Sequence, residues 1–264
     1  MSATAVVRGW GAAAAIAVRA VGVVIAILVV VQALIVVEAR PQDLITGFHG
    51  MVDIIRRATP PDFSRLPDVA WPALETVDIA IFGTLGGVIM ALPLAVLAAV
   101  NVTPSRVLYY LSRGVIGFTR AVPDLVWALL FVTAVGLGPF AGMLALGIHT
   151  GGVLAKLLSE TIESIEPGQV EGVAATGAGR LHVIAFGVVP QVMPNFLSYV
   201  MLRFESDIRS ASVIGMVGGG GIGFYLWDTI RSFKDREAAT VILLIVAMVM
   251  LTDIVSSRVR RAAI

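Results

Sequence analysis

The sequence predicts an all-α membrane protein with about six transmembrane helices. Hydrophobic residues make up 58% of the 264 residues and charged residues only 14%, a proportion that a soluble domain of this size cannot bury while keeping a wettable surface. Stretches of roughly 20 mainly apolar residues, the length that a helix needs to cross a bilayer, recur along the chain. Much of the apolar surface is therefore expected to face lipid.

The composition also excludes several classes of protein. The net charge is +1 and no basic stripe is present, which argues against nucleic-acid binding. Cysteine is absent, and His49, His149 and His182 are too far apart to suggest a metal site. Neither Lys156 nor Lys234 lies in a nucleotide-binding glycine loop. We therefore expect no enzyme activity and no cofactor in this chain, and if ATP drives it, another chain binds the nucleotide.

The N-terminal part, residues 1–76, is predicted to hold one transmembrane helix and an external loop. The helix is expected at residues 20–37, and its apolar run is too long for the core of a cleaved signal peptide. The polar, proline-containing loop at 38–76 is expected to include a short amphipathic helix near 44–57.

The remaining residues, 77–264, are predicted to form the transmembrane core. Spans are expected at residues 77–100, 107–135, 140–158, 183–217 (or from 192) and 238–255, with a re-entrant or surface segment at 224–236. The span at 107–135 is interpreted as one long helix kinked at Pro123. Because short cytoplasmic loops carry the positive excess, the arginine distribution predicts that both termini are cytoplasmic.

A loop at about 159–190 carries the most specific pattern in the chain. The pattern consists of Glu171, Ala174, Ala175 and Gly177, followed by Ile184 and Pro190. Pro167 suits the first turn of a short helix, and Gly177 or Gly179 suits its end. The small residues leave one helix face bare, which favours docking of another protein, although an ordinary amphipathic connector would also fit.

This pattern resembles the cytoplasmic loop of ABC importer permeases. In that family the loop forms a coupling helix that inserts into a groove on the ATPase subunit. The resemblance implies a type I ABC importer permease fold in which Glu171, Ala174, Ala175 and Gly177 dock on the ATPase.

Two further stretches are similar to motifs of permeases of the phosphonate importer family. They are residues 120–128 and 205–223, and Asp207 departs from the family pattern, which has asparagine there. The resemblance implies a bacterial inner-membrane permease that moves a phosphonate, phosphate or phosphite oxyanion. It further implies a homodimer, two ATPase subunits that bind ATP and Mg, and a periplasmic or lipid-anchored solute-binding protein.

Five charged residues within the predicted spans are candidates for the translocation pathway. They are Arg120, Asp124, Glu205, Asp207 and Arg209. Forked guanidinium donors suit tetrahedral oxyanions, and the carboxylates would keep the arginines from trapping the anion. Arg120 and Asp124 are four residues apart, as are Glu205 and Arg209, so the two residues of each pair can meet on one helix face. Each pair can therefore equally be an ion pair that neutralises its own charges and has no role in transport.

A glycine run is the candidate gate. It comprises Gly218, Gly219, Gly220, Gly221 and Gly223. Glycine reaches backbone angles closed to other residues, so the run can flex, but it can equally allow helix ends to pack tightly.

Two other functions remain as alternatives. The first is a secondary transporter that moves a small anion with an ion gradient, although the two halves of the chain show no internal repeat. The second is a membrane enzyme acting on phosphorylated lipids, which the sequence disfavours because it lacks a catalytic triad or a metal cluster.

Overall fold

The computed structural model describes residues 3–38 and 41–263, and these residues form helices and turns without a strand. The helices are α1 (Ala3–Val36), α2 (Pro41–Ala58), α3 (Leu66–Ala98), α4 (Arg106–Ala121), α5 (Asp124–Val135), α6 (Pro139–Glu163), α7 (Pro167–Ala175), α8 (Arg180–Val183), α9 (Val189–Ile214), α10 (Gly221–Arg231) and α11 (Asp235–Ala263). The chain divides into two compact units, Met1–Arg56 and Arg57–Ile264. The predicted all-α class is confirmed.

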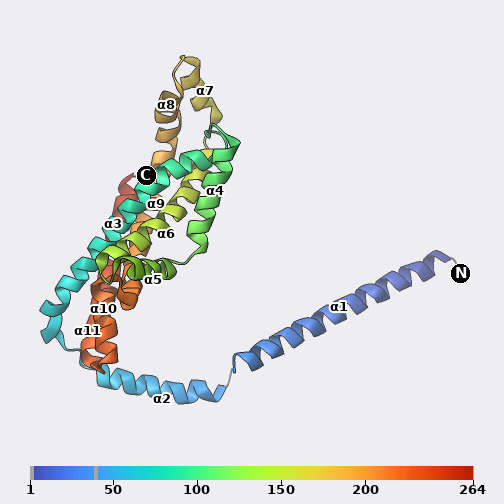
Figure 1. The fold of residues 1–264 in the computed structure, drawn as a ribbon. Helices are drawn as coiled ribbons and strands as arrows, with labels where there is room; N and C mark the ends of the chain where they lie inside the picture. The colour runs from blue at the N-terminus through green and yellow to red at the C-terminus, as the bar shows by residue number, and fades with distance from the viewer. Residues whose placement is uncertain (1–2, 39–40, 264) are drawn as a thin grey trace. The chain divides into compact units, whose positions relative to one another are not determined.

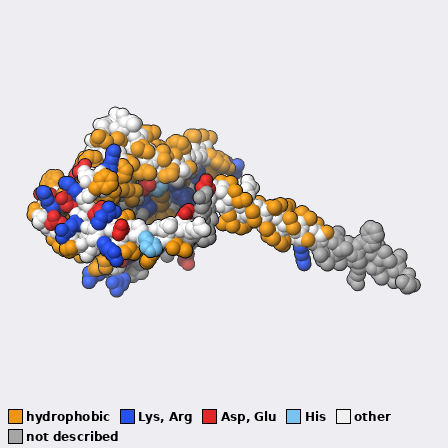
Figure 2. Space-filling model, turned by 90° about the horizontal axis from the view of Figure 1, so that it is seen from below, with side chains coloured by type: hydrophobic (Ala, Val, Ile, Leu, Met, Phe, Trp, Pro, Cys, Tyr) orange, Lys and Arg blue, Asp and Glu red, His pale blue; other side chains and the backbone are white. Residues whose placement is uncertain are grey.

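The first unit holds α1 and most of α2. The segment Ala17–Val36 of α1 has a mean hydropathy of 2.6 and is long enough to cross a bilayer. Figure 2 shows hydrophobic side chains along this segment. Helix α2 corresponds to the predicted amphipathic helix: Ile45, Phe48 and Ile55 share one face by helical spacing, and Asp43 and Arg57 lie on the opposite face.

The second unit contains the remaining candidate spans. Among the described residues, five helical segments are long and apolar enough to cross a membrane, and a sixth results if α4 and α5 count together. Helix α3 begins at Leu66, earlier than the predicted residue 77. A 3₁₀ turn, η1 (Phe63–Arg65), precedes it, and Asp62 caps this turn by accepting the backbone N–H of Ser64 at 3.0 Å. The candidate span thus includes part of the predicted external loop.

The third predicted span is broken rather than kinked. Helices α4 and α5 meet at an angle of 89° across Val122 and Pro123. Proline lacks a backbone N–H, and the residue before it prefers an extended conformation, which Val122 adopts with ψ of 120°. The expected single helix over residues 107–135 is therefore wrong, because the break at Pro123 turns the chain through almost a right angle.

Helices α3 and α6 pack closely through glycines. A Cβ atom at Gly87 would lie only 2.8 Å from Thr150 Cγ2 and 3.0 Å from the backbone nitrogen of Gly151. Gly147, one turn earlier on α6, lies against Gly83 and Gly87 of α3. Small residues let two helix backbones approach in this way where a bilayer supplies no hydrophobic driving force between them.

The predicted fifth span is irregular on both sides of α9. The segment η2 (Ile184–Val188) before α9 is a π-helical turn, whereas η3 (Gly215–Gly219) after α9 continues the helix only to a kink at Gly218, whose φ of +97° is not helical. Within the second unit, α7 and α8 lie at one end and α10 lies near the other (Figure 1). The two candidate functional regions, the loop with α7 and the glycine run before α10, are therefore far apart.

Candidate functional site

Helix α7 corresponds to the predicted loop helix. It begins at Pro167 and ends at Ala175, and Gly177 follows with φ of +79°, a left-handed conformation that glycine adopts without strain. The side chains of Glu171, Ala174 and Ala175 are all exposed. The helix therefore presents an exposed face of small residues with one carboxylate.

The other side of α7 is fastened to the π-helical turn η2. The Cα of Val170 lies 3.2 Å from where a Cβ of Gly187 would be, so the absence of a side chain at Gly187 favours this close approach. Gln191 bridges the two segments: its Oε1 accepts the N–H of Glu166 at 3.1 Å, and its Nε2 donates to the carbonyl of Gly187 at 2.7 Å. Helix α7 is thus attached directly to the start of α9.

Asp207 lies at the centre of a buried polar network and is fully shielded from solvent. Its carboxylate accepts hydrogen bonds from Thr84 Oγ1 and Thr150 Oγ1, each at 2.8 Å, and from Arg203 Nη2 at 2.9 Å. These groups come from α3, α6 and α9. Sequence reasoning missed Arg203 as the partner of Asp207, although the i,i+4 spacing on one helix could have indicated it.

The second charged pair on α9 forms as its spacing predicts. Arg209 Nη1 lies 2.9 Å from Glu205 Oε1, and Arg260 of α11 approaches the other oxygen of Glu205 at 4.0 Å. The Arg209 side chain is 49% exposed whereas that of Glu205 is 12% exposed. Glu205 thus holds the guanidinium group of Arg209 in place, and this group remains accessible to solvent.

The predicted pairing of Arg120 with Asp124 does not occur. The break at Pro123 places the two residues on different helices, and no ion pair joins them in the described part of the chain. Asp124 instead accepts the N–H of Leu125 at 2.9 Å, and the Arg120 side chain is exposed. The spacing argument failed because it assumed a continuous helix.

The glycine run forms a tight turn between η3 and α10. Gly218, Gly220 and Gly221 have φ values of +97°, +81° and +71°. A Cβ atom at Gly223 would clash with the carbonyl oxygen of Ser212. The run therefore has both properties predicted for it, namely unusual backbone angles and close packing.

Contacts from other helices hold this turn in place. Thr76 Oγ1 accepts the N–H of Ile222 at 2.8 Å, and the carbonyl of Gly218 accepts the N–H of Gly138 at 2.9 Å. A cavity of about 270 Å³ borders the run and also includes Glu75 and Phe224. Whether the turn opens as a gate stays a prediction.

The fold matches solved structures of ABC transporters. The inward-facing MetNI methionine ABC transporter contains a chain that aligns with a TM-score of 0.66 and 20% identity, covering 77% of this chain and 99% of that chain. The likeness shows the fold: a type I ABC importer permease.

The sequence comparisons define the family. Residues 91–263 match the model described as "binding-protein-dependent transport system inner membrane component", and the chain belongs to this family. The phosphite transport system permease protein PtxC of Stutzerimonas stutzeri is 37% identical over 218 residues, 83% of this chain and 79% of that protein. The phosphate-import permease protein PhnE of Mycolicibacterium smegmatis is 36% identical over 231 residues, 87% of this chain and 43% of that protein. The chain is thus a permease component of a transport system.

Proposed function

We propose that this chain forms the transmembrane pathway of an ATP-driven importer for a small phosphorus oxyanion: phosphite, phosphate or phosphonate. The exposed face of α7 carries the proposal, because it offers a docking surface for a motor that the chain does not itself contain. The substrate class follows from the relatives named for phosphite and phosphate transport.

In the proposed assembly two copies of this chain enclose the pathway and two ATPase subunits bind ATP and Mg. Glu171, Ala174, Ala175 and Gly177 contact the ATPase, which puts α7 and both termini on the cytoplasmic side. The opposite end of the second unit, where α10 lies (Figure 1), then faces a periplasmic or lipid-anchored solute-binding protein. A symmetric pair is the commonest solution for a homo-oligomer.

Along the pathway, Arg209 and Arg120 supply donors for the oxyanion. Both side chains are accessible, and Glu205 holds Arg209 in place through its 2.9 Å contact. A charge within a membrane span is costly, so such residues usually face a protein interior or a wet cavity. Asp207, being fully buried, is assigned the role of fixing the helices around this path rather than contacting the anion.

The test of the proposed function is uptake by reconstituted vesicles that contain this chain and its cognate ATPase, with the binding protein added outside. We expect uptake of radiolabelled phosphite, phosphate or phosphonate that requires ATP inside the vesicles. Vesicles with an ATPase variant that cannot hydrolyse ATP serve as the control. Uptake that persists with this variant and follows a proton or sodium gradient would establish the secondary-transporter alternative instead.

Docking at α7 predicts the effect of added bulk on its exposed face. Ala175→Leu keeps a good helix former but places a larger side chain against the ATPase, a kind of overpacking that costs about 1–3 kcal/mol in a protein core. The amount of ATPase that co-purifies with the permease should fall, and uptake with it. Gln169→Leu is the matched control, because residue 169 is also exposed but lies on a different face by helical spacing. Equal loss in both variants would contradict docking through the Glu171 and Ala175 face.

A further inference from the structure

We infer that Glu163 and Arg113 are positioning residues that transmit the movement of α7 to the turn between α3 and α4, residues 99–105. Glu163 is the last residue of α6, directly before the segment that carries α7, and Arg113 lies in the middle of α4. The inference rests on the proposed function, since it concerns how force from an ATPase at α7 reaches the helices of the pathway.

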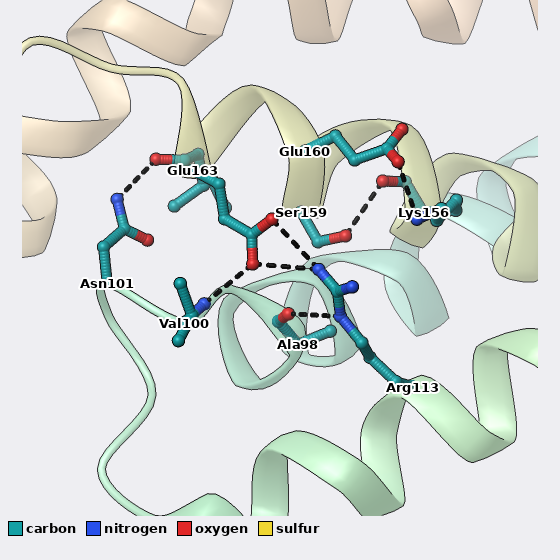
Figure 3. A network of polar contacts seen from close by, with 9 residues as sticks. Ala98, Val100, Asn101, Arg113, Lys156, Ser159, Glu160 and Glu163 are labelled. Carbon is teal, nitrogen blue, oxygen red and sulfur yellow. Dashed lines mark hydrogen bonds and ion pairs between the residues drawn. The ribbon is translucent and has the colours of Figure 1, made fainter. Parts of the chain in front are cut away.

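The Glu163 carboxylate joins the end of α6 to the middle of α4 and to the turn after α3 (Figure 3). Arg113 Nη2 donates to its Oε1 and Oε2 at 2.9 and 3.0 Å, and the backbone N–H of Val100 donates to Oε1 at 3.0 Å. The neighbouring carbonyl of Ile162 accepts Asn101 Nδ2 at 2.6 Å. The end of α6 is therefore fastened both to α4 and to the turn that follows α3.

Arg113 is itself held from several sides. Its Nε donates to the carbonyl of Ala98, the last residue of α3, at 3.2 Å, and its guanidinium carbon lies 4.8 Å from the ring centre of Tyr109. The side chains of Arg113 and Glu163 are 33% and 24% exposed. Partial burial and several charge-assisted hydrogen bonds make this contact stronger than an isolated surface ion pair.

The far side of the α7 segment is tied to the same turn. Arg180, which begins α8, donates from Nη2 to the carbonyl of Val102 at 2.6 Å. Residues 164–179 are thus anchored to the 99–105 turn on both sides, by Glu163 before α7 and by Arg180 after it. A displacement of α7 must therefore move this turn, and with it α4, or break the two contacts.

The chain provides a matched comparison one turn away. Lys156 Nζ lies 2.6 Å from Glu160 Oε1, but both residues belong to α6. This pair, which Figure 3 shows beside the Glu163 network, joins no second helix within the part of the chain that the structure describes. A variant at Glu160 removes the same charge from the same helix without loosening α6 from α4.

The experiment measures substrate imported per ATP hydrolysed in vesicles that contain the permease, the ATPase and the binding protein. We expect Glu163→Gln to lower this ratio by at least about fivefold, the lower end of typical coupling between two sites, while the bound ATPase and its hydrolysis rate stay near the wild-type values. Glu160→Gln should behave as the wild type. Arg113→Gln should match Glu163→Gln, and the double variant should be no worse than either single variant, because all three remove the same interaction.

Several results would overturn the inference. Loss of bound ATPase in Glu163→Gln would assign the residue to docking, and multiplicative losses in the double variant would show that Arg113 and Glu163 act separately. If Glu163→Gln does not assemble, Arg113→Gln takes its place, since it removes the same contact from the α4 side and should lower the same ratio. An unchanged ratio in Arg113→Gln would then overturn the inference.

Failure of this inference and failure of the proposed function give different outcomes. If the wild-type chain shows no ATP-dependent uptake, the proposed function is wrong. If the wild type is ATP-coupled and Glu163→Gln equals Glu160→Gln, only the role of the α6 contact is wrong.

Discussion

Replacing Asp207 with alanine is expected to destabilise the folded chain by about 3–5 kcal/mol, the cost of removing one partner from a buried ion pair. The substitution would leave the guanidinium of Arg203 without its counter-charge, and the hydroxyls of Thr84 and Thr150 without their shared acceptor. The measurement is the temperature at which the detergent-purified protein loses its monodisperse elution peak, compared with the wild type.

Asp207→Asn separates the charge from the hydrogen bonds at this position. An asparagine oxygen can still accept from one of the threonines, so we expect a smaller loss, on the order of 1–3 kcal/mol. Glu205→Gln provides a second comparison, because Glu205 is also paired four residues along α9 but is not fully buried. Equal stability of Asp207→Ala and Glu205→Gln would show that the buried network contributes no more than the more accessible pair.

Replacing Gly223 with alanine is expected to destabilise the turn before α10 by about 1–3 kcal/mol, the usual range for overpacking. The added methyl group would meet the Ser212 carbonyl and would lie 3.0 Å from the Cα of Gly215. Since both are backbone atoms, no side-chain rotation can relieve the contact. The same thermal measurement applies, with uptake measured in parallel.

The matched control for this glycine is Gly117→Ala in α4. A Cβ atom there meets no other atom within 4 Å, and alanine favours a helix interior over glycine by about 1 kcal/mol. The two glycine substitutions should therefore change stability in opposite directions. A Gly223→Ala protein with wild-type stability but impaired uptake would instead support the flexible gate.

Local sequence signals predicted the helices and the α7 loop well. Pro167 and Gly177 mark the ends of α7 because each imposes its own backbone geometry, whatever the rest of the fold does. The Glu205 and Arg209 pair was predictable for a similar reason, since both residues lie within one continuous helix.

Contacts between distant segments were not predictable from one sequence. Glu163 and Arg113 are 50 residues apart, and Thr84 and Asp207 are 123 apart; neither contact leaves a periodic signal. The expected pairing of Arg120 with Asp124 failed for another reason. A proline indicates that the helix bends, but the packing of the following helix determines the angle of the bend. The π-helical turn η2 was missed because one additional residue in a turn hardly changes the hydrophobic period.

The break at Pro123 also determines how this part of the chain fits the bilayer. Helix α4 has 16 residues, which at 1.5 Å per residue gives about 24 Å, less than the roughly 30 Å of a typical hydrocarbon core. Helix α5 adds little length because it leaves at 89°. A short segment is accommodated by thinning of the bilayer, by snorkelling of flanking residues or by oligomerisation. For α4 we expect thinning, so that the membrane beside it is thinner than the membrane beside α3.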